Sequence, residues 1–407
     1  MNTPRRSTII VLCLVAAAGA LLYLKAWPFV SGLLPIVKTS VPLPLTDDEL
    51  PFELPEGFAA SVFASSTPGA RVLTRDPAGT IVVSLTSEGK VVALPDRDSN
   101  HKADSVVTIL QDLNQPHGIV FLCGEGLSLG DEPECTLYVA EEHALKAYEY
   151  DADAFVVANP RTLISNLPYD GGHHTRTLML HPDGEQILVS VGSSCNACHE
   201  KNPYRAAVLS YNARTGETSE FAAGLRNTVF MAIHPVTGEA WGTDMGRDNL
   251  GDDLPPDEVN ILQKGKNYGW PYCYGKQIHD VDFDAGKNPC GPTHPSQLDL
   301  QAHSAPLGLA FVPEEGWPED WWHDLLIAYH GSWNRSIPTG YKIVRFDLDP
   351  EGNSVGTAPN DFMAGFMTSD GRLVGRPVDI MIQPGGTMYV SDDRAGVIYR
   401  IFRIQEP

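Results

Sequence analysis

Short apolar runs separated by Pro/Gly turns recur along this chain, and residues 224–273 show the pattern most clearly. Residues 228–233 are apolar and β-prone, residues 234–238 form a Pro/Gly turn, and residues 239–243 are a second short strand before a long acidic loop. Two strands joined by a hairpin run in opposite directions, so Arg226 and Asn227, before the first strand, share a face with residues 244–253, after the second. The unit therefore predicts a polar surface at one end of a small sheet.

The same strand–turn–strand unit recurs when each Pro/Gly turn is used as a register mark. Units begin at Ala70, Pro116, His173, Leu225, Ala305 and Gly375. A third strand usually follows, at residues 90–94, 145–150, 206–211, 341–347 and 397–402. Because almost no amphipathic helical stretch lies between the units, the pattern predicts an all-β fold, a six-bladed β-propeller. Residues 58–64 remain at the start, and we expect them to pair with the last blade and close the ring.

Propeller geometry brings two groups of residues to one face: those before each innermost strand and those after each second strand. The first group is His117, His173, His174, Arg226, Asn227, His303 and Arg376. The second is Glu141, Glu142, His143, Asp244, Gly246, Arg247, Asp248, His330, Trp333, Asn334, Arg335, Asp392, Asp393 and Arg394. Several guanidiniums at the centre of one face suggest a ligand with several carboxylates or phosphates. The alternative is that each arginine pairs with an aspartate of a neighbouring blade.

Composition and charge narrow the choice of partner. The 407 residues are 43% hydrophobic, which is enough for a sizeable core, and the formal net charge is −22. A charge of this sign argues against binding nucleic acid or an anionic membrane through a basic patch. Propellers of this length are single units, so we expect one domain over residues 52–407.

The first 30 residues predict an export signal or membrane anchor. Arg5 and Arg6 precede an uncharged apolar run over residues 8–24, which Lys25 and two aromatic residues follow. Residues 18–20 would suit a signal peptidase, but the apolar run continues beyond them, so we favour an uncleaved anchor. Residues 31–51, rich in Pro and Thr, are then a linker. The body is expected outside that membrane, in a periplasmic location, with the N-terminal segment as its only membrane contact.

The cysteines agree with an exported body. One lies in the anchor, and the other six fall in near neighbours, Cys123/Cys135, Cys195/Cys198 and Cys273/Cys290. Three local disulfides are the favoured interpretation, although sequence order alone leaves other pairings and reduced thiols open.

Ordered segments along most of the chain carry a resemblance to a known family. They are ALPDRDSNHKAD at Ala93, LNQPHGI at Leu113, GGHHTRTL at Gly171, GSSCNAC at Gly192, GLRNTV at Gly224, GDDLPPDE at Gly251, NYGWPYC at Asn267, HGSWNRSIPTGYK at His330 and SDDRAG at Ser391. From about residue 54 to 404 the chain resembles the sorbosone dehydrogenases, within the wider group of quinoprotein glucose/sorbosone dehydrogenases. The resemblance implies a six-bladed propeller that oxidises a sugar or sugar aldehyde with pyrroloquinoline quinone (PQQ) held by Ca²⁺. It also implies an external electron acceptor.

The resemblance also implies roles for particular residues. The family's catalytic base falls on His173, with His174 adjacent, and the quinone-contacting residues match Arg226, Asn227 and Arg376. The calcium-binding backbone carbonyls correspond to Gly246 and Arg247, beside Met245 where glucose dehydrogenases can carry glutamine.

Ordinary chemistry supports these assignments. Oxidation of a carbinol by a quinone needs a base for the hydroxyl proton and a cation to polarise the quinone oxygens. Arg335 is a further cofactor candidate, in a segment that aligns poorly with the glucose enzymes, and Trp333 or Trp270 would cover a flat ring.

Other functions remain open at this stage. Cys195, Cys198 and His199 have the spacing for covalent c-type haem attachment, but the motif lies between two propeller strands, so a disulfide or thiol pair is favoured. A six-bladed propeller can also be a non-catalytic binding module or a Ca²⁺-dependent lactonase. The many central arginines fit the lactonase poorly.

Overall fold

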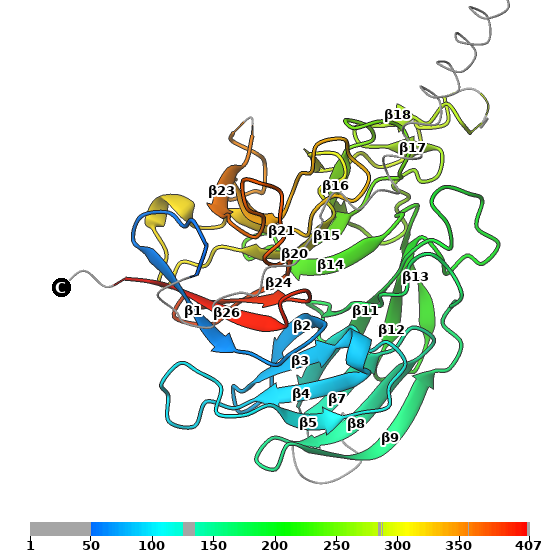
Figure 1. Ribbon diagram of the computed structural model, residues 1–407. Helices are drawn as coiled ribbons and strands as arrows, with labels where there is room; N and C mark the ends of the chain where they lie inside the picture. The colour runs from blue at the N-terminus through cyan, green and yellow to red at the C-terminus, as the bar shows by residue number, and fades with distance from the viewer. Residues whose placement is uncertain (1–49, 125–134, 284–285, 287, 357, 405–407) are drawn as a thin grey trace, which may run out of the picture.

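The structure, a computed structural model, describes residues 50–124, 135–283, 286, 288–356 and 358–404. It is an all-β, six-bladed propeller, as the repeat predicted. Figure 1 shows the blades arranged around a centre, with the chain running from blue to red. The predicted anchor, residues 1–30, and nearly all of the predicted linker, residues 31–51, lie outside the described residues. Within the described part, no helix has the length and apolar character needed to cross a bilayer.

Each blade is a four-stranded antiparallel sheet whose first strand is innermost. Blades 1 to 3 are β2 (Ala70–Arg75), β3 (Ile81–Leu85), β4 (Lys90–Leu94) and β5 (Val107–Leu110); β6 (Ile119–Cys123), β7 (Cys135–Ala140), β8 (Leu145–Asp151) and β9 (Val156–Ile164); and β10 (Leu178–Leu180), β11 (Gln186–Val191), β12 (Ala207–Asn212) and β13 (Thr218–Ala223). The connection from β3 to β4 contains the 3-10 helix η2 (Thr86–Glu88).

Blades 4 to 6 complete the ring. They are β14 (Thr228–Ile233), β15 (Ala240–Asp244), β16 (Asp257–Leu262) and β19 (Leu298–Leu300); β20 (Pro306–Phe311), β21 (Leu325–Tyr329), β22 (Lys342–Phe346) and β23 (Asn360–Met363); and β24 (Pro377–Ile382), β25 (Met388–Asp392), β26 (Val397–Arg403) and β1 (Phe58–Ala64). A small hairpin, β17 (Cys273–Tyr274) and β18 (Ile278–His279), lies between β16 and β19, and η3 (Glu319–Trp321) precedes β21.

Strand β1 closes the ring. It pairs antiparallel with β26, so the N-terminal strand becomes the outermost strand of the last blade. Figure 1 shows this directly, because the blue β1 lies beside the red β26. The prediction for residues 58–64 is confirmed. The pairing joins the two ends of the described chain and covers a sheet edge that would otherwise be open.

Burial falls from the centre of the ring outward. Every residue of β15, β21 and β25 is buried, because these strands pack between neighbouring blades on both faces. Most residues of the outermost β9 are exposed or half-buried. The innermost strands contact one another in ring order, β2, β6, β10, β14, β20, β24 and back to β2. The residues that flank them are thereby brought together at the centre.

Three disulfides join Cys123 to Cys135, Cys195 to Cys198 and Cys273 to Cys290. These are the local pairs that the sequence favoured over reduced thiols. The first links the far ends of β6 and β7, whereas the second closes a short loop after β11 on the central face.

Candidate functional site

His173 lies immediately before blade 3 and faces a cavity of about 320 Å³ on the central face. Its Nδ1 is 2.9 Å from the Ser193 carbonyl oxygen and 3.0 Å from the Ser193 hydroxyl. Because a carbonyl can only accept, Nδ1 carries the proton, and Nε2 is the free, unprotonated nitrogen of the ring. Burial first, and then the Arg226 guanidinium, lower the pKa of His173 to about 3. The imidazole is therefore neutral at ordinary pH and has the form that a proton acceptor needs.

The adjacent His174 has a different environment. Its side chain is 53% exposed, and its nearest ionic partner is Glu142, at 3.6 Å from Nδ1. His173, not His174, is among the residues that line the cavity. The structure thus distinguishes the two adjacent histidines, which the sequence alone did not: only His173 faces the cavity.

Arg226 and Asn227 lie in the loop that precedes β14, and their backbone is held by one buried carboxylate. Asp244, at the end of β15, accepts hydrogen bonds from the backbone N–H groups of Arg226 at 2.9 Å and Asn227 at 2.5 Å. Asp392 does the same in blade 6, where it accepts from the backbone N–H of Arg376 at 3.0 Å. These two aspartates therefore orient the arginine-bearing loops instead of facing a ligand.

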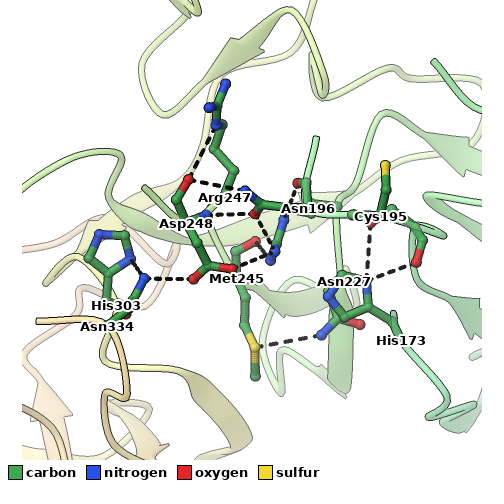
Figure 2. Close-up of polar contacts among 12 residues, drawn as sticks. His173, Cys195, Asn196, Asn227, Met245, Arg247, Asp248, His303 and Asn334 are labelled. Carbon is green, nitrogen blue, oxygen red and sulfur yellow. Dashed lines mark hydrogen bonds and ion pairs between the residues drawn. The ribbon is translucent and has the colours of Figure 1, made fainter. Parts of the chain in front are cut away.

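The Arg226 guanidinium is held on several sides. It donates to the backbone carbonyl of Asn196 at 2.8 Å, the side-chain oxygen of Asn196 at 2.9 Å and the Met245 carbonyl at 3.2 Å. It also lies 3.2 Å from the Asp248 carboxylate, and its side chain is only 7% exposed. Figure 2 shows this cluster, with Asn196, Met245 and Asp248 labelled.

Asn227 has an unused acceptor. Its amide nitrogen donates to the Met245 sulfur at 3.5 Å, whereas its side-chain oxygen is buried without a hydrogen-bond partner among the described residues. A buried amide oxygen with no partner costs free energy, about 1–3 kcal/mol, unless a ligand or water donates to it. Asn227 lies beside His173 and Met245 in Figure 2, but it does not line the cavity, and its side-chain oxygen packs against Gly192.

Asp248 of blade 4 contacts Asn334, which adds blade 5 to the same wall. The Asn334 amide donates to Asp248 at 2.6 Å and lies 3.3 Å from Nδ1 of His303. The other ring nitrogen of His303 contacts the Gly251 and Leu254 carbonyls at 2.9 and 3.1 Å. Burial raises the pKa of Asp248, although Arg226 opposes the shift. The cavity is thus bounded by blades 3, 4 and 5.

The two proposed calcium residues diverge. Gly246 lines the cavity, and its N–H donates to Asp257 at 2.9 Å. The Arg247 side chain is turned elsewhere, with its guanidinium 2.8 Å from Asp280 and 2.9 Å from Asp282. Its charge is therefore neutralised by carboxylates outside the cavity wall.

Arg376 lies away from this cavity, in a second cluster at the centre of the ring. It donates to the carbonyls of His330 at 3.1 Å and Gly331 at 3.2 Å, and burial lowers its pKa. Asp393 contacts Arg71 at 2.9 Å and His330 at 3.0 Å. The structure does not bring Arg376 and Arg226 into one pocket wall, although both flank innermost strands as predicted.

Trp333 and Arg335 follow β21. Trp333 lines the cavity, and 60% of its surface is exposed, so it is available to cover a bound ring. Trp270 does not line this cavity; it borders a smaller hollow with Arg247 and Asp280. Arg335 is occupied by the acidic loop: it donates to the carbonyls of Asp252 and Ala302 and lies 3.3 Å from Asp253.

The sequence pattern did not predict Ser193, which contacts His173, or Asn196, which contacts Arg226. Both residues follow β11, the second strand of blade 3. Residues after each second strand are expected on the central face, so this rule, applied to blade 3, would predict Ser193. The Cys195–Cys198 spacing, in contrast, points only to a haem or a disulfide and gives no role to Asn196. In the structure the two sulfurs are bonded to each other, and His199 contacts the Tyr272 hydroxyl at 3.1 Å.

Comparison with known proteins identifies relatives over the whole propeller. The family model described as TrAA12-like matches residues 52–403. An uncharacterised protein of Borreliella burgdorferi is 32% identical over 366 residues, covering 86% of this chain and 90% of that protein. A PQQ-dependent sugar dehydrogenase of Hypocrea jecorina is 26% identical over 253 residues, which cover 50% of this chain and 56% of that protein.

Solved structures show the same fold at lower identity. The calcium structure of the Trichoderma reesei family AA12 enzyme has a TM-score of 0.75 and 21% identity, covering 90% of this chain and 100% of that chain. The holo PQQ domain of pyranose dehydrogenase from Coprinopsis cinerea has a TM-score of 0.72 and 22% identity, covering 89% of this chain and 98% of that chain.

Proposed function

The chain belongs to the TrAA12-like family, and from this membership and the cavity between blades 3 and 5 we propose that it is a PQQ-dependent oxidoreductase of a sugar or sugar aldehyde. The observation that carries the proposal is the neutral His173 in the cavity wall, with the unpaired oxygen of Asn227 close by. Relatives named as PQQ-dependent dehydrogenases of sugars and pyranose support the same chemistry. The sorbosone or aldose specificity is the finer part of this proposal.

The residues present suit a flat, acidic cofactor. PQQ, when bound, supplies a two-electron acceptor. Arg226 would contribute positive charge to its carboxylates or quinone oxygens, and Asn227, next to Arg226, would support that wall through its contact with Met245. Arg376 would extend the positive field from the centre of the ring. Trp333 would cover one face of the ring system.

His173 has the geometry of the general base. The Ser193 carbonyl accepts a hydrogen bond from Nδ1–H, so Nε2 remains free to accept the hydroxyl proton of a substrate bound in the cavity. Its lowered pKa keeps this nitrogen unprotonated over a wide pH range. We also propose an external electron acceptor, because a dehydrogenase must be reoxidised after each turnover.

We propose that Ca²⁺ binds to the carbonyl oxygens of Gly246 and Arg247. Ca²⁺ takes oxygen ligands, so the Met245 sulfur, which already contacts Asn227, would not replace a glutamine oxygen. A cation here would depend on backbone carbonyls and on oxygens of the cofactor. Export of the body to a periplasmic location, tethered by residues 1–30, is likewise part of the proposal.

Reconstitution tests the function directly. The purified protein is mixed with PQQ and Ca²⁺, and the bound-quinone spectrum and dye reduction are followed with a panel of aldoses and sorbosone. We expect saturable quinone binding and dye reduction with at least one sugar. Absence of quinone binding at any Ca²⁺ concentration would overturn the proposal. Saturable binding without turnover on any sugar would favour the binding module, and lactone hydrolysis without quinone would favour the lactonase.

A further inference from the structure

The loop over residues 193–198 contacts both central residues of the site. Ser193 holds Nδ1 of His173, and its hydroxyl donates to the Cys195 carbonyl at 2.7 Å. Asn196, next in the loop, accepts from Arg226 through its backbone oxygen at 2.8 Å and its side-chain oxygen at 2.9 Å. Figure 2 shows Asn196 and Cys195 on the side of the cluster away from His303 and Asn334.

The side chain of Asn196 also joins Arg226 to its acidic partner. Its oxygen accepts from the backbone N–H of Asp248 at 2.8 Å, and its nitrogen donates to the Asp248 carbonyl at 3.1 Å. One amide therefore bridges the cation and the backbone of the anion that neutralises it. Asn196 does not line the cavity, whereas Arg226 and Asp248 do, so it acts on the cavity through them.

The disulfide restrains this amide covalently. Asn196 lies inside the small ring that the Cys195–Cys198 bond closes, at a sequence separation of 3. A short covalent ring removes backbone freedom that an open loop would retain. Both cysteines are half-buried, and a small thiol reductant can therefore reach them.

We propose that Asn196 is a positioning residue, held by the Cys195–Cys198 disulfide, that fixes the direction of the Arg226 guanidinium and thereby the affinity of the site for the quinone. The inference rests on the proposed function, because it concerns the same cavity. Opening the ring takes two electrons and two protons: a dithiol reductant is oxidised to its disulfide, and the S–S bond becomes two thiols. The freed loop then releases Arg226.

The first experiment measures quinone binding, independently of turnover, by quenching of tryptophan fluorescence in titrations with PQQ and Ca²⁺. Asn196→Ala should bind at least about tenfold more weakly than the wild type, since it loses hydrogen bonds to a charged group. Asn196→Asp keeps an acceptor oxygen for Arg226 and should recover part of the affinity. Equal affinity in the wild type and Asn196→Ala would overturn the positioning role while leaving the proposed function intact.

The second experiment uses the disulfide and does not depend on the folding of the Asn196 variants. Treatment with dithiothreitol, which is removed without air before PQQ is added because a dithiol would reduce the quinone, should weaken quinone binding by the wild type, whereas Cys195→Ser/Cys198→Ser should bind weakly with or without this treatment. Cys123→Ser/Cys135→Ser is the matched control, because that disulfide lies at the far end of β6, and it should respond as the wild type does. A reductant effect that survives in Cys195→Ser/Cys198→Ser would overturn the proposal.

A pH profile separates positioning from general loss of structure. His173 faces Arg226, His174 and Arg176, and Arg226 is the charge that most lowers its pKa. If Asn196→Ala lets Arg226 move away, the acid limb of turnover should shift to higher pH. An unchanged limb would contradict the mechanism. If the wild type itself binds no quinone, the proposed function fails, and this inference fails with it.

Discussion

Two clusters on the central face differ in how completely their polar groups are paired. Between blades 3 and 5, Nε2 of His173 and the side-chain oxygen of Asn227 have no hydrogen-bond partner among the described residues, and His173 lines a cavity of about 320 Å³. Across blades 1, 5 and 6, by contrast, Asp393 is bridged by Arg71 and His330. The first cluster therefore leaves polar atoms unpaired beside a cavity, whereas the ion pairs of the second link three blades.

The charges of the second cluster show why it suits a structural role. Burial opposes ionisation of Asp393, but His330 and Arg71 hold the pKa of that carboxyl well below its ordinary value. Burial also lowers the pKa of His330 to about 4, despite Asp393, so this ring is uncharged at neutral pH. The Arg71 guanidinium at 2.9 Å is then the cation that keeps Asp393 ionised.

The largest expected effect is on His173. His173→Gln should still bind quinone but lose about 10²–10⁴ in rate, because glutamine cannot accept the substrate proton. Since the pKa of His173 is lowered to about 3, the wild-type rate should stay level well below pH 6 and fall only in strong acid. His174→Gln is the matched control and should turn over normally. The reverse result, with His174→Gln inactive and His173→Gln active, would move the base by one residue.

The arginines come next. Arg226→Ala should weaken quinone binding by about 2–5 kcal/mol, whereas Arg376→Ala, whose guanidinium does not line the cavity, should weaken it less, and lysine should restore only part of either loss because it lacks the planar fork. PQQ titrations of the four variants provide the measurement. If only Arg226→Ala has an effect, the ligand stays within the cavity of blades 3 to 5. If neither variant differs from the wild type, the central-face assignment is wrong.

A smaller effect on stability tests the bridged cluster. Asp393→Asn should lower the free energy of unfolding at pH 7 by about 2 kcal/mol, less than a fully buried pair loses, because Asp393 is 21% exposed. The folded-state pKa of Asp393 lies below its unfolded value, so its contribution is present above about pH 4 and disappears as pH falls. Urea unfolding at pH 7 and pH 3 should therefore show a difference between wild type and variant that shrinks in acid. A difference that grows in acid would contradict this account.

The smallest effect is expected at Arg335. Its ionic partner Asp253 is 90% exposed, and a solvent-screened pair contributes about 1 kcal/mol or less. Arg335→Ala should leave quinone affinity nearly unchanged and alter stability only slightly. A loss of quinone affinity comparable to that of Arg226→Ala would instead place Arg335 among the cofactor-binding residues.

Much of the architecture was predictable because it follows from local repetition. Pro/Gly turns mark the hairpins, and the ends of β14, β4 and β26 agree with the predicted strands to within about one residue. Residues 58–64 belong to no repeat unit, and the last blade lacked an outermost strand. Their role as the closing strand, paired with β26, could therefore be inferred. The three disulfides were also predictable, because each joins two cysteines that are close together in the sequence.

The sequence by itself determined which residues reach the central face, because the position of a residue relative to a strand decides the end of the blade on which it lies. Only the tertiary structure decided the partner of each residue. Arg226 is held by Asn196 from blade 3, and Arg335 by the acidic loop after β15. Asp244 and Asp392, which the sequence grouped with ligand-facing residues, bind backbone N–H groups instead. The physical reason is that a hydrogen bond forms only when the donor–acceptor distance between loops of different blades is correct to within a few tenths of an ångström. A repeat pattern in the sequence does not contain those distances.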